Sequence, residues 1–410
     1  MMRYTFIFLL LLSSLLSQTT KEQAKKLKTH WGIKKKFHSV LNEDSISLSF
    51  PGYIIGVEKA SRKKLGLKKL DDIKPFLNYD SEQLNAEEKK FLVKRINDSK
   101  IQFVSHIVKF AKDDNAPNLH KKIIYNVYQN TDELQTSQVF KSGWDSILSL
   151  KEQLAVYIEK HQITHVFLCA LGWNTPQQKA LKNLNTLFSK VYEKASRKSN
   201  YLFIGITWPS KWGIPGISYQ NKKQDAEEVG LLYANSLLHN VLLPLKKVFK
   251  FRVVLIGHSF GARLLARGLF SAHFLSQNMA KNRGKIDLFI GLQAALDIKY
   301  FLEDGEYHSF RAHAKKFVFT WSTSDKKMNA WSFTARNRFL GTKRAFSVAK
   351  DHENFVLGSV NQHGQISPQE NSSKILLVDA KKIISHHSDV FNHHVAEFVS
   401  QLVKIYCKSQ

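Results

Sequence analysis

Cysteine is nearly absent from this chain, which has only Cys169 and Cys407 among its 410 residues. Two thiols cannot form a disulfide framework, and their positions, one within an apolar run and one near the end of the chain, indicate free, non-catalytic cysteines. No cysteine lies near the end of the apolar stretch at residues 1–17, which argues against lipid attachment of the bacterial lipoprotein type. The chain also has no internal repeat and no low-complexity tract, so no repeat architecture is indicated.

Acidic residues are also few. The chain has 34 Asp and Glu and 61 Lys and Arg, which gives a formal net charge of +27. Such an excess attracts nucleic acid, anionic lipid or acidic polymers, or it simply keeps the surface solvated. The excess is spread along the chain without a block that resembles a binding arm, so no nucleic-acid partner is expected. An anionic membrane surface is the candidate partner. Hydrophobic residues make up 43% of the chain, enough for a sizeable core.

Long apolar runs are confined to the first residues. Arg3 precedes the apolar run Phe6–Leu12, and the small and polar residues 17–20 offer an exit. This pattern is typical of a secretory signal peptide, and its apolar core is too short to span a bilayer as a mature helix. We therefore predict a signal peptide over residues 1–20 and export to the periplasm or the medium. An uncleaved membrane anchor is the alternative.

The next hundred residues have the weakest secondary-structure pattern in the chain. Residues 46–57 are compatible with one or two short strands broken by Pro51 and Gly52, and residues 81–107 have the apolar spacing of a helix. We predict a basic N-terminal region over residues 21–122, partly packed on a larger domain over residues 123–406.

From residue 146 onward, strands and helices alternate. Apolar strands are predicted at residues 166–171, 201–208, 253–256, 286–292, 317–321 and 375–378, with a closing helix at residues 393–405. Alternation of this kind implies parallel pairing through right-handed crossovers, hence an α/β fold with a doubly wound, mostly parallel sheet and an N-terminal extension. Ligands bind such sheets at the carboxyl ends of the strands.

The most informative stretch is residues 252–267, R-V-V-L-I-G-H-S-F-G-A-R-L-L-A-R. A buried strand leads into G-x-S-x-G, and a helical pattern follows directly, which is the context of a nucleophile elbow. Gly257 and Gly261 are expected because a Cβ at either position would collide with the neighbouring strand or helix. Ser259 is therefore the predicted nucleophile, and a structural glycine turn is the alternative.

A serine hydroxyl needs a histidine to take its proton and a carboxylate to orient that histidine. In the elbow-bearing fold the chain order is serine, acid, histidine, each after a strand end. Asp325 is the first carboxylate after the strand at residues 317–321, and it is the predicted acid. Asp297 is the alternative acid. If Asp325 is not catalytic, it is expected to cap a helix. His387 is the predicted base and His386 the alternative.

Further predictions concern the residues near His387 and the residue before the serine. Ser388 or Asp389 is expected to cap the closing helix and so hold the preceding imidazole still. The four histidines of H-H-S-D-V-F-N-H-H lack the spacing and carboxylate of an H-E-x-x-H helix, so neither a metal nor another cofactor is expected. His258 is expected to pack in the elbow rather than act as the base.

Two loops complete the predicted site. The backbone N–H groups of Phe260 and Trp173 are the candidate oxyanion donors, although a simple tight turn at residues 172–174 is the alternative for the second. Trp208, Trp212 and Ile214 follow a strand at the same edge, where they would wall an acyl pocket or merely pack beneath the loop.

Four segments together carry a resemblance: H-V-F-L-C-A-L-G-W-N-T, I-T-W-P-S, V-V-L-I-G-H-S-F-G-A-R and H-H-S-D-V-F. They resemble the α/β-hydrolase superfamily, and within it a group of exported bacterial hydrolases with an HG(Y/W)N-type loop. The resemblance covers residues 164–404 and implies a serine hydrolase of esters, lipids or related acyl compounds, with Ser259, Asp325 and His387 as its triad. Leu171 stands where the group has a histidine, which changes the support of the oxyanion loop.

The resulting hypothesis is an exported, esterase- or lipase-like serine hydrolase that cleaves a small-molecule or lipid acyl ester. The runner-up is a secreted protein that keeps the α/β scaffold without catalysis and binds a host or envelope partner through its basic surface.

Overall fold

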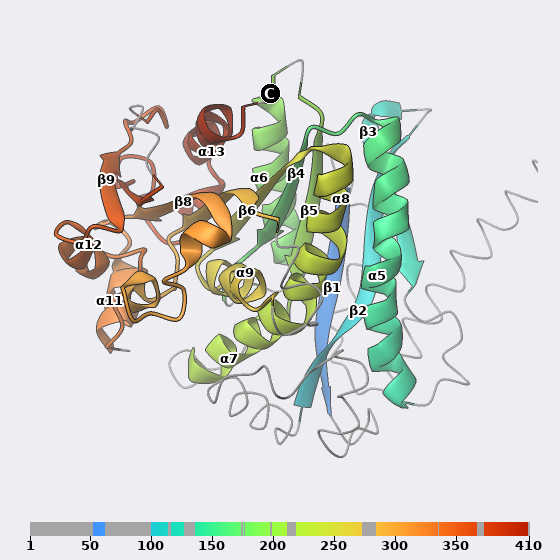
Figure 1. Cartoon of the computed structure of the whole chain (residues 1–410), viewed down its shortest axis with the longest axis horizontal. Coiled ribbons are helices and arrows are strands. Elements are labelled where there is room, and N and C mark those ends of the chain that lie inside the picture. Colours follow the sequence, from blue (N-terminus) through green and yellow to red (C-terminus); the bar gives the residue numbers. More distant parts are fainter. Residues whose placement is uncertain are drawn as a thin grey trace, which may run out of the picture.

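The computed structural model describes residues 52–61, 100–113, 116–126, 136–173, 175, 177–196, 199–210, 219–272, 284–334, 336–366 and 373–408. Within these ranges, ten strands form one sheet in the order β3-β2-β1-β5-β4-β6-β7-β8-β10-β9 (Figure 1). Every pairing from β1 to β9 along this order is parallel, and the pairings of β2 with β1 and with β3 are antiparallel. The predicted fold class is confirmed.

The strands are β1 (Gly52–Ser61), β2 (Lys100–Asp113), β3 (Ala116–Asn126), β4 (His165–Ala170), β5 (Tyr201–Thr207), β6 (Arg252–His258), β7 (Ile286–Leu292), β8 (Ala314–Trp321), β9 (Phe355–Ser359) and β10 (Ile375–Asp379). The helices are α5 (Thr136–Lys160), α6 (Gln177–Glu193), α7 (Tyr219–Val229), α8 (Leu243–Phe249), α9 (Phe260–Phe270), α11 (Lys326–Thr334), α12 (Lys343–Ala349) and α13 (His393–Tyr406). Two π-helical segments, at Gly230–Ala234 and Leu237–Leu242, lie between α7 and α8.

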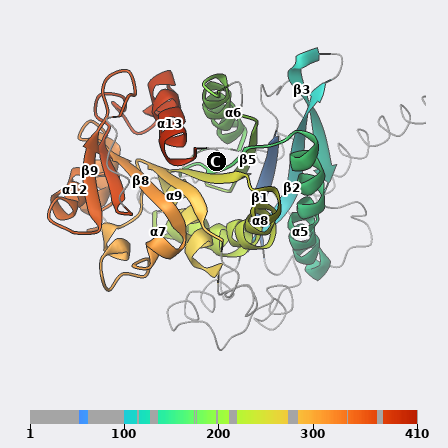
Figure 2. The same ribbon diagram turned by 45° about the horizontal axis from the view of Figure 1, so that its top comes forward.

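Helices cover both faces of the sheet. Figure 2 shows α6 and α13 on one face, and α5, α7, α8 and α9 on the other. The residues of β6 divide accordingly, since Val253 and Leu255 belong to one buried cluster and Val254 and Ile256 to the other. Side chains that alternate between two apolar layers explain why this strand reads as an unbroken apolar run.

The N-terminal region differs from the expectation. β2 begins at Lys100, so the helix predicted over residues 81–107 is wrong for its last eight residues, and the preceding residues 81–99 lie outside the described part. β2 pairs with β1 and β3, and this pairing overrides the helical spacing. The boundary drawn between residues 122 and 123 falls inside β3.

The leader predicted over residues 1–20 also lies outside the described residues. Among the helices that the structure describes, none is long and apolar enough to cross a membrane.

Candidate functional site

The chain turns from strand to helix at Ser259, which stands between the end of β6 and the start of α9. Its φ of 54° and ψ of −121° lie in a region that residues with a side chain rarely adopt. Backbone hydrogen bonds hold this conformation, because Ser259 N–H donates to the carbonyl of Leu292 at 3.1 Å and Ala295 N–H donates to the carbonyl of Ser259 at 3.2 Å. The end of β7 and the residues after it thus support the turn.

The two glycines of the elbow allow its close packing. A Cβ on Gly257 would collide with the backbone of Ala262 in α9, and one on Gly261 would collide with the carbonyl of Ala170 at the end of β4. The expectation that neither position tolerates a side chain is confirmed, and the sharp turn follows from it.

Asp325 and His387 meet across 62 residues of sequence. The Nδ1 of His387 lies 2.8 Å from Oδ2 of Asp325, whose side chain is fully buried, and the histidine side chain is 11% exposed. The second carboxylate oxygen, Oδ1, accepts the backbone N–H of Met328 at the start of α11. Asp325 therefore caps a helix and orients an imidazole at once. With Nδ1–H donating to the carboxylate, Nε2 is the nitrogen that can accept a proton.

The alternative acid and base lie elsewhere. The carboxylate of Asp297 caps the 3₁₀ turn Ile298–Phe301, with Oδ1 accepting the N–H of Lys299 at 3.1 Å and Oδ2 accepting that of Arg338 at 3.3 Å. The side chain of His386 is 70% exposed and lies beside Asp389. The structure brings together Asp325 and His387, and neither Asp297 nor His386 joins them.

His258, next to the nucleophile in sequence, supports the histidine loop. Its Nε2–H donates to the backbone carbonyl of His387 at 3.0 Å, and the two rings lie 4.8 Å apart between centroids. Burial lowers the pKa of His258 well below its usual value, and the charge on a protonated His387 would lower it further. His258 is therefore neutral. In the described part of the chain Ser259 Oγ makes no hydrogen bond, and such bonds often form only in the substrate complex.

The helix cap expected at Ser388 or Asp389 is wrong. The side chain of Asn392 accepts the N–H of Val395 and caps α13, whereas the Asp389 carboxylate accepts the N–H and the hydroxyl of Ser385. These contacts close the residues on either side of His387 into a compact loop. Across the described residues, no three His, Cys, Asp or Glu side chains gather closely enough to hold a metal ion.

The loop with the second predicted donor passes directly over the nucleophile. A Cβ on Gly172 would lie 2.6 Å from Cβ and 3.2 Å from Oγ of Ser259, so only glycine allows this approach. Trp173 follows it, with its ring 6.3 Å from that of Phe260, the residue after the serine. The two predicted donors, at the first residue of α9 and in the loop after β4, thus flank Ser259.

One aromatic residue beside the predicted base was not predicted from the sequence. Trp331 in α11 lies 5.1 Å from the ring of Trp173 and 5.4 Å from that of His387. The available signal was a tryptophan six positions after the predicted acid, on the short helix that the acid begins.

Of the three residues predicted to line an acyl pocket, the structure describes one. Trp212 and Ile214 lie outside the described residues. Trp208 is buried, and its indole N–H donates to the backbone carbonyl of Leu171 at 2.8 Å. This contact places Trp208 under the loop at residues 171–175, which corresponds to the packing alternative.

Residues 146–342 match the family described as alpha/beta hydrolase of unknown function (DUF900). The matched segment includes Ser259 and Asp325 and ends before His387. That description agrees with the resemblance seen in the motifs. No curated protein matches the chain.

Solved structures show only remote likeness. TT1662 from Thermus thermophilus is 10% identical over 60% of this chain and 91% of its own, with a TM-score of 0.34. An acetylxylan esterase is 11% identical over 60% and 96%, with a TM-score of 0.26. A lipase B of Aspergillus fumigatus is 13% identical over 58% and 51%, with a TM-score of 0.27. Scores this low carry no argument about activity.

Proposed function

We propose that this chain, which belongs to the α/β-hydrolase superfamily, is a serine hydrolase that cleaves acyl esters through Ser259, His387 and Asp325. The observation that carries the proposal is the 2.8 Å contact between His387 Nδ1 and the buried carboxylate of Asp325, beside a serine held at positive φ. A buried carboxylate that orients an imidazole, together with a serine held at a sharp turn between strand and helix, is the arrangement that activates a hydroxyl.

The reaction follows from these positions. His387 Nε2 takes the proton of Ser259 as Oγ attacks the ester carbonyl, and Asp325 stabilises the imidazolium that forms. The backbone N–H groups of Phe260 and Trp173 donate to the oxyanion. His387 then returns the proton to the leaving alcohol, and water, activated by the same imidazole, releases the acid and restores Ser259.

Electrostatics favour the charged intermediate. Ser259 precedes an eleven-residue helix, and the positive end of the helix dipole at its N-terminus favours developing negative charge. A removed oxyanion donor costs about 10²–10³ in kcat in related chemistry, so the placement of these donors is a major part of the proposed activity.

The substrate is proposed to be an ester with an apolar acyl or alcohol part. Trp331 lies beside His387, and Trp173 lies beside Trp331, so the two rings offer aromatic surface to such a group. Trp212 and Ile214 are proposed to extend this wall, on the support of their position in the sequence after β5.

Labelling with a fluorophosphonate probe tests the proposal. We expect a single covalent adduct on Ser259, located by peptide mass spectrometry, together with hydrolysis of p-nitrophenyl esters from acetyl to palmitoyl. The Ser259→Ala variant should show neither. Absence of an adduct on the wild-type chain, under conditions that label a control esterase, would leave a non-catalytic binding protein as the better account.

We further propose that the protein is exported and works near an anionic membrane surface. The apolar stretch before residue 20 and the charge of +27 support this. Detection of the mature N-terminus after expression with an intact leader tests the export step. A mature protein that still begins at Met1 in the cytoplasm contradicts it.

A further inference from the structure

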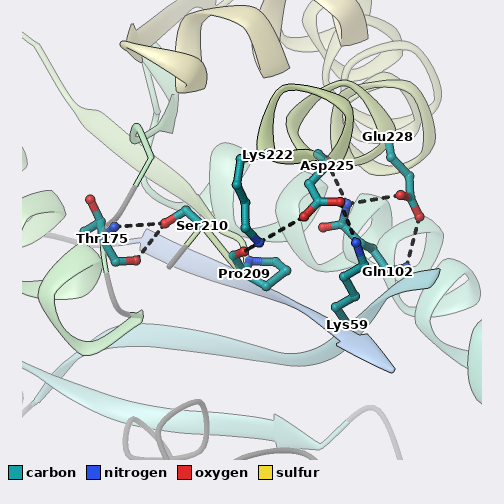
Figure 3. Close-up of polar contacts among 8 residues, drawn as sticks. All are labelled: Lys59, Gln102, Thr175, Pro209, Ser210, Lys222, Asp225 and Glu228. Carbon is teal, nitrogen blue, oxygen red and sulfur yellow. Dashed lines mark hydrogen bonds and ion pairs between the residues drawn. The ribbon is translucent and has the colours of Figure 1, made fainter. Parts of the chain in front are cut away.

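The segment Trp208–Ser210 contacts the loop at residues 171–175, here called the oxyanion loop, at both of its ends. At the first end, the indole N–H of Trp208 donates to the carbonyl of Leu171. At the second end, the hydroxyl of Ser210 donates to the carbonyl of Thr175 at 2.7 Å and accepts the N–H of Thr175 at 3.1 Å (Figure 3). Two side chains from one turn therefore hold the two ends of the loop.

The Ser210 hydroxyl is well suited to this contact. It is buried, with the residue 2% exposed, and the group both donates to and accepts from the same residue. A hydroxyl has one proton and two lone pairs, so it can bond the backbone N–H and the backbone carbonyl of Thr175 at once and fix both. Truncation to alanine would leave the N–H and the carbonyl of Thr175 without those partners.

Charged side chains of α7 and β1 hold the turn that carries both side chains. Lys222 Nζ in α7 donates to the carbonyl of Pro209 at 2.5 Å and pairs with Asp225 at 2.9 Å (Figure 3). Asp225, in turn, pairs with Lys59 of β1 at 2.6 Å, and its backbone carbonyl accepts the side-chain amide of Gln102 in β2 at 2.7 Å. The support of the turn thus comes from α7 and from the N-terminal strands.

We propose that Ser210 and Trp208 are positioning residues for the second oxyanion donor, the backbone N–H of Trp173. This inference rests on the proposed function. Trp173 lies between the two held ends, one residue after the glycine that touches Ser259. A donor must be fixed before charge develops, and a displacement of about 1 Å costs about 10²-fold in rate. The two side chains supply that rigidity to the loop.

The test compares Ser210→Ala and Trp208→Phe with Ser400→Ala as a matched control. Ser400 is equally buried, its hydroxyl donates to the carbonyl of Lys194, and it lies in α13 away from the oxyanion loop. For a p-nitrophenyl ester, we expect kcat to fall about 10- to 100-fold in both site variants, KM to stay within about twofold, and Ser400→Ala to retain wild-type kcat. Hydrogen exchange at the Thr175 amide should accelerate in Ser210→Ala only.

Each outcome decides the matter. A Ser210→Ala protein with the kcat of Ser400→Ala, or one whose kcat falls with unchanged Thr175 exchange, overturns the inference. If Ser210→Ala does not fold, Trp208→Phe decides by the same kcat and KM criterion. A wild-type chain that hydrolyses no ester would refute the proposed function instead, and Thr175 exchange would then still report whether Ser210 holds the loop.

Discussion

The two loops that face each other across Ser259 are built in opposite ways. The elbow at residues 257–261 is held by its own glycines and by backbone hydrogen bonds to the end of β7. The oxyanion loop at residues 171–175 is held by side chains of Trp208 and Ser210 from a different part of the chain. The elbow is therefore a property of local sequence, whereas the geometry of the facing loop depends on tertiary contacts.

Ser259→Ala removes the nucleophile of the elbow and should have the largest effect. We expect ester hydrolysis to fall by about 10⁴-fold or more, with the residual rate coming from binding and the oxyanion donors. The fold should persist, because the turn is held by backbone contacts that alanine keeps. Steady-state kinetics and circular dichroism check both statements, with Ser400→Ala as the control. An alanine variant with more than about a tenth of wild-type kcat contradicts the assignment.

Asp325→Asn should have the next largest effect. The amide oxygen can still cap α11 by accepting the Met328 N–H, but the charge beside His387 Nδ1 is lost and the wrong imidazole tautomer is favoured. We expect kcat to fall by about 10⁴-fold at nearly unchanged thermal stability. Asp297→Asn is the matched control, since its carboxylate serves backbone N–H groups, and it should stay within about twofold of wild type. The reverse ranking of the two variants would assign the acid to Asp297.

Gly172→Ala tests the facing loop by steric means. A Cβ there lies 2.6 Å from Cβ of Ser259, so the loop must move away from the nucleophile and carry the Trp173 N–H with it. We expect kcat to fall by about 10²-fold while the fold is retained. Gly284→Ala is the control, because its Cβ meets only ordinary contacts with Leu243. Wild-type kcat in Gly172→Ala would show that the loop does not contribute a donor.

His258→Gln should have the smallest effect, on the pH dependence of stability. The pKa of the buried His258 is lowered in the folded state, so the unfolded chain binds its proton first as pH falls below about 6.5. The stability that the neutral imidazole contributes is complete above that pH and is lost as pH falls toward the folded-state pKa. Urea unfolding midpoints measured from pH 8 to pH 5 should fall less steeply for His258→Gln than for wild type. Parallel curves would contradict the lowered pKa.

The contrast between the loops also explains what the sequence could predict. The strand, the turn and the helix of residues 252–267 are encoded by neighbouring residues, and Asp325 and His387 follow from strand ends and chain order. Trp331 and the Ser210 contact could not be found this way, because each acquires its role only when distant segments meet. For the same reason Lys59 and Gln102 gave no signal, although they lie in strands that support α7.

The apolar pattern of the sequence was also a weaker guide to the strands at the edges of the sheet. Among the described strands, β9 lies at one edge and pairs with β10, and β2 and β3 extend the other end by antiparallel pairing. Edge strands lack the unbroken apolar runs that mark strands buried on both faces, and partial burial weakens the pattern.

If both loops serve the nucleophile, a Ser259 adduct receives hydrogen bonds from two loops of different construction. A crystal structure of the chain phosphonylated by a fluorophosphonate would show these bonds. We predict phosphorus bonded to Ser259 Oγ, His387 within hydrogen-bond distance of the adduct, and a phosphonyl oxygen about 2.7–3.1 Å from the backbone nitrogens of both Phe260 and Trp173. An adduct on another residue, or a phosphonyl oxygen that contacts neither nitrogen, would refute the proposed nucleophile or the proposed oxyanion donors.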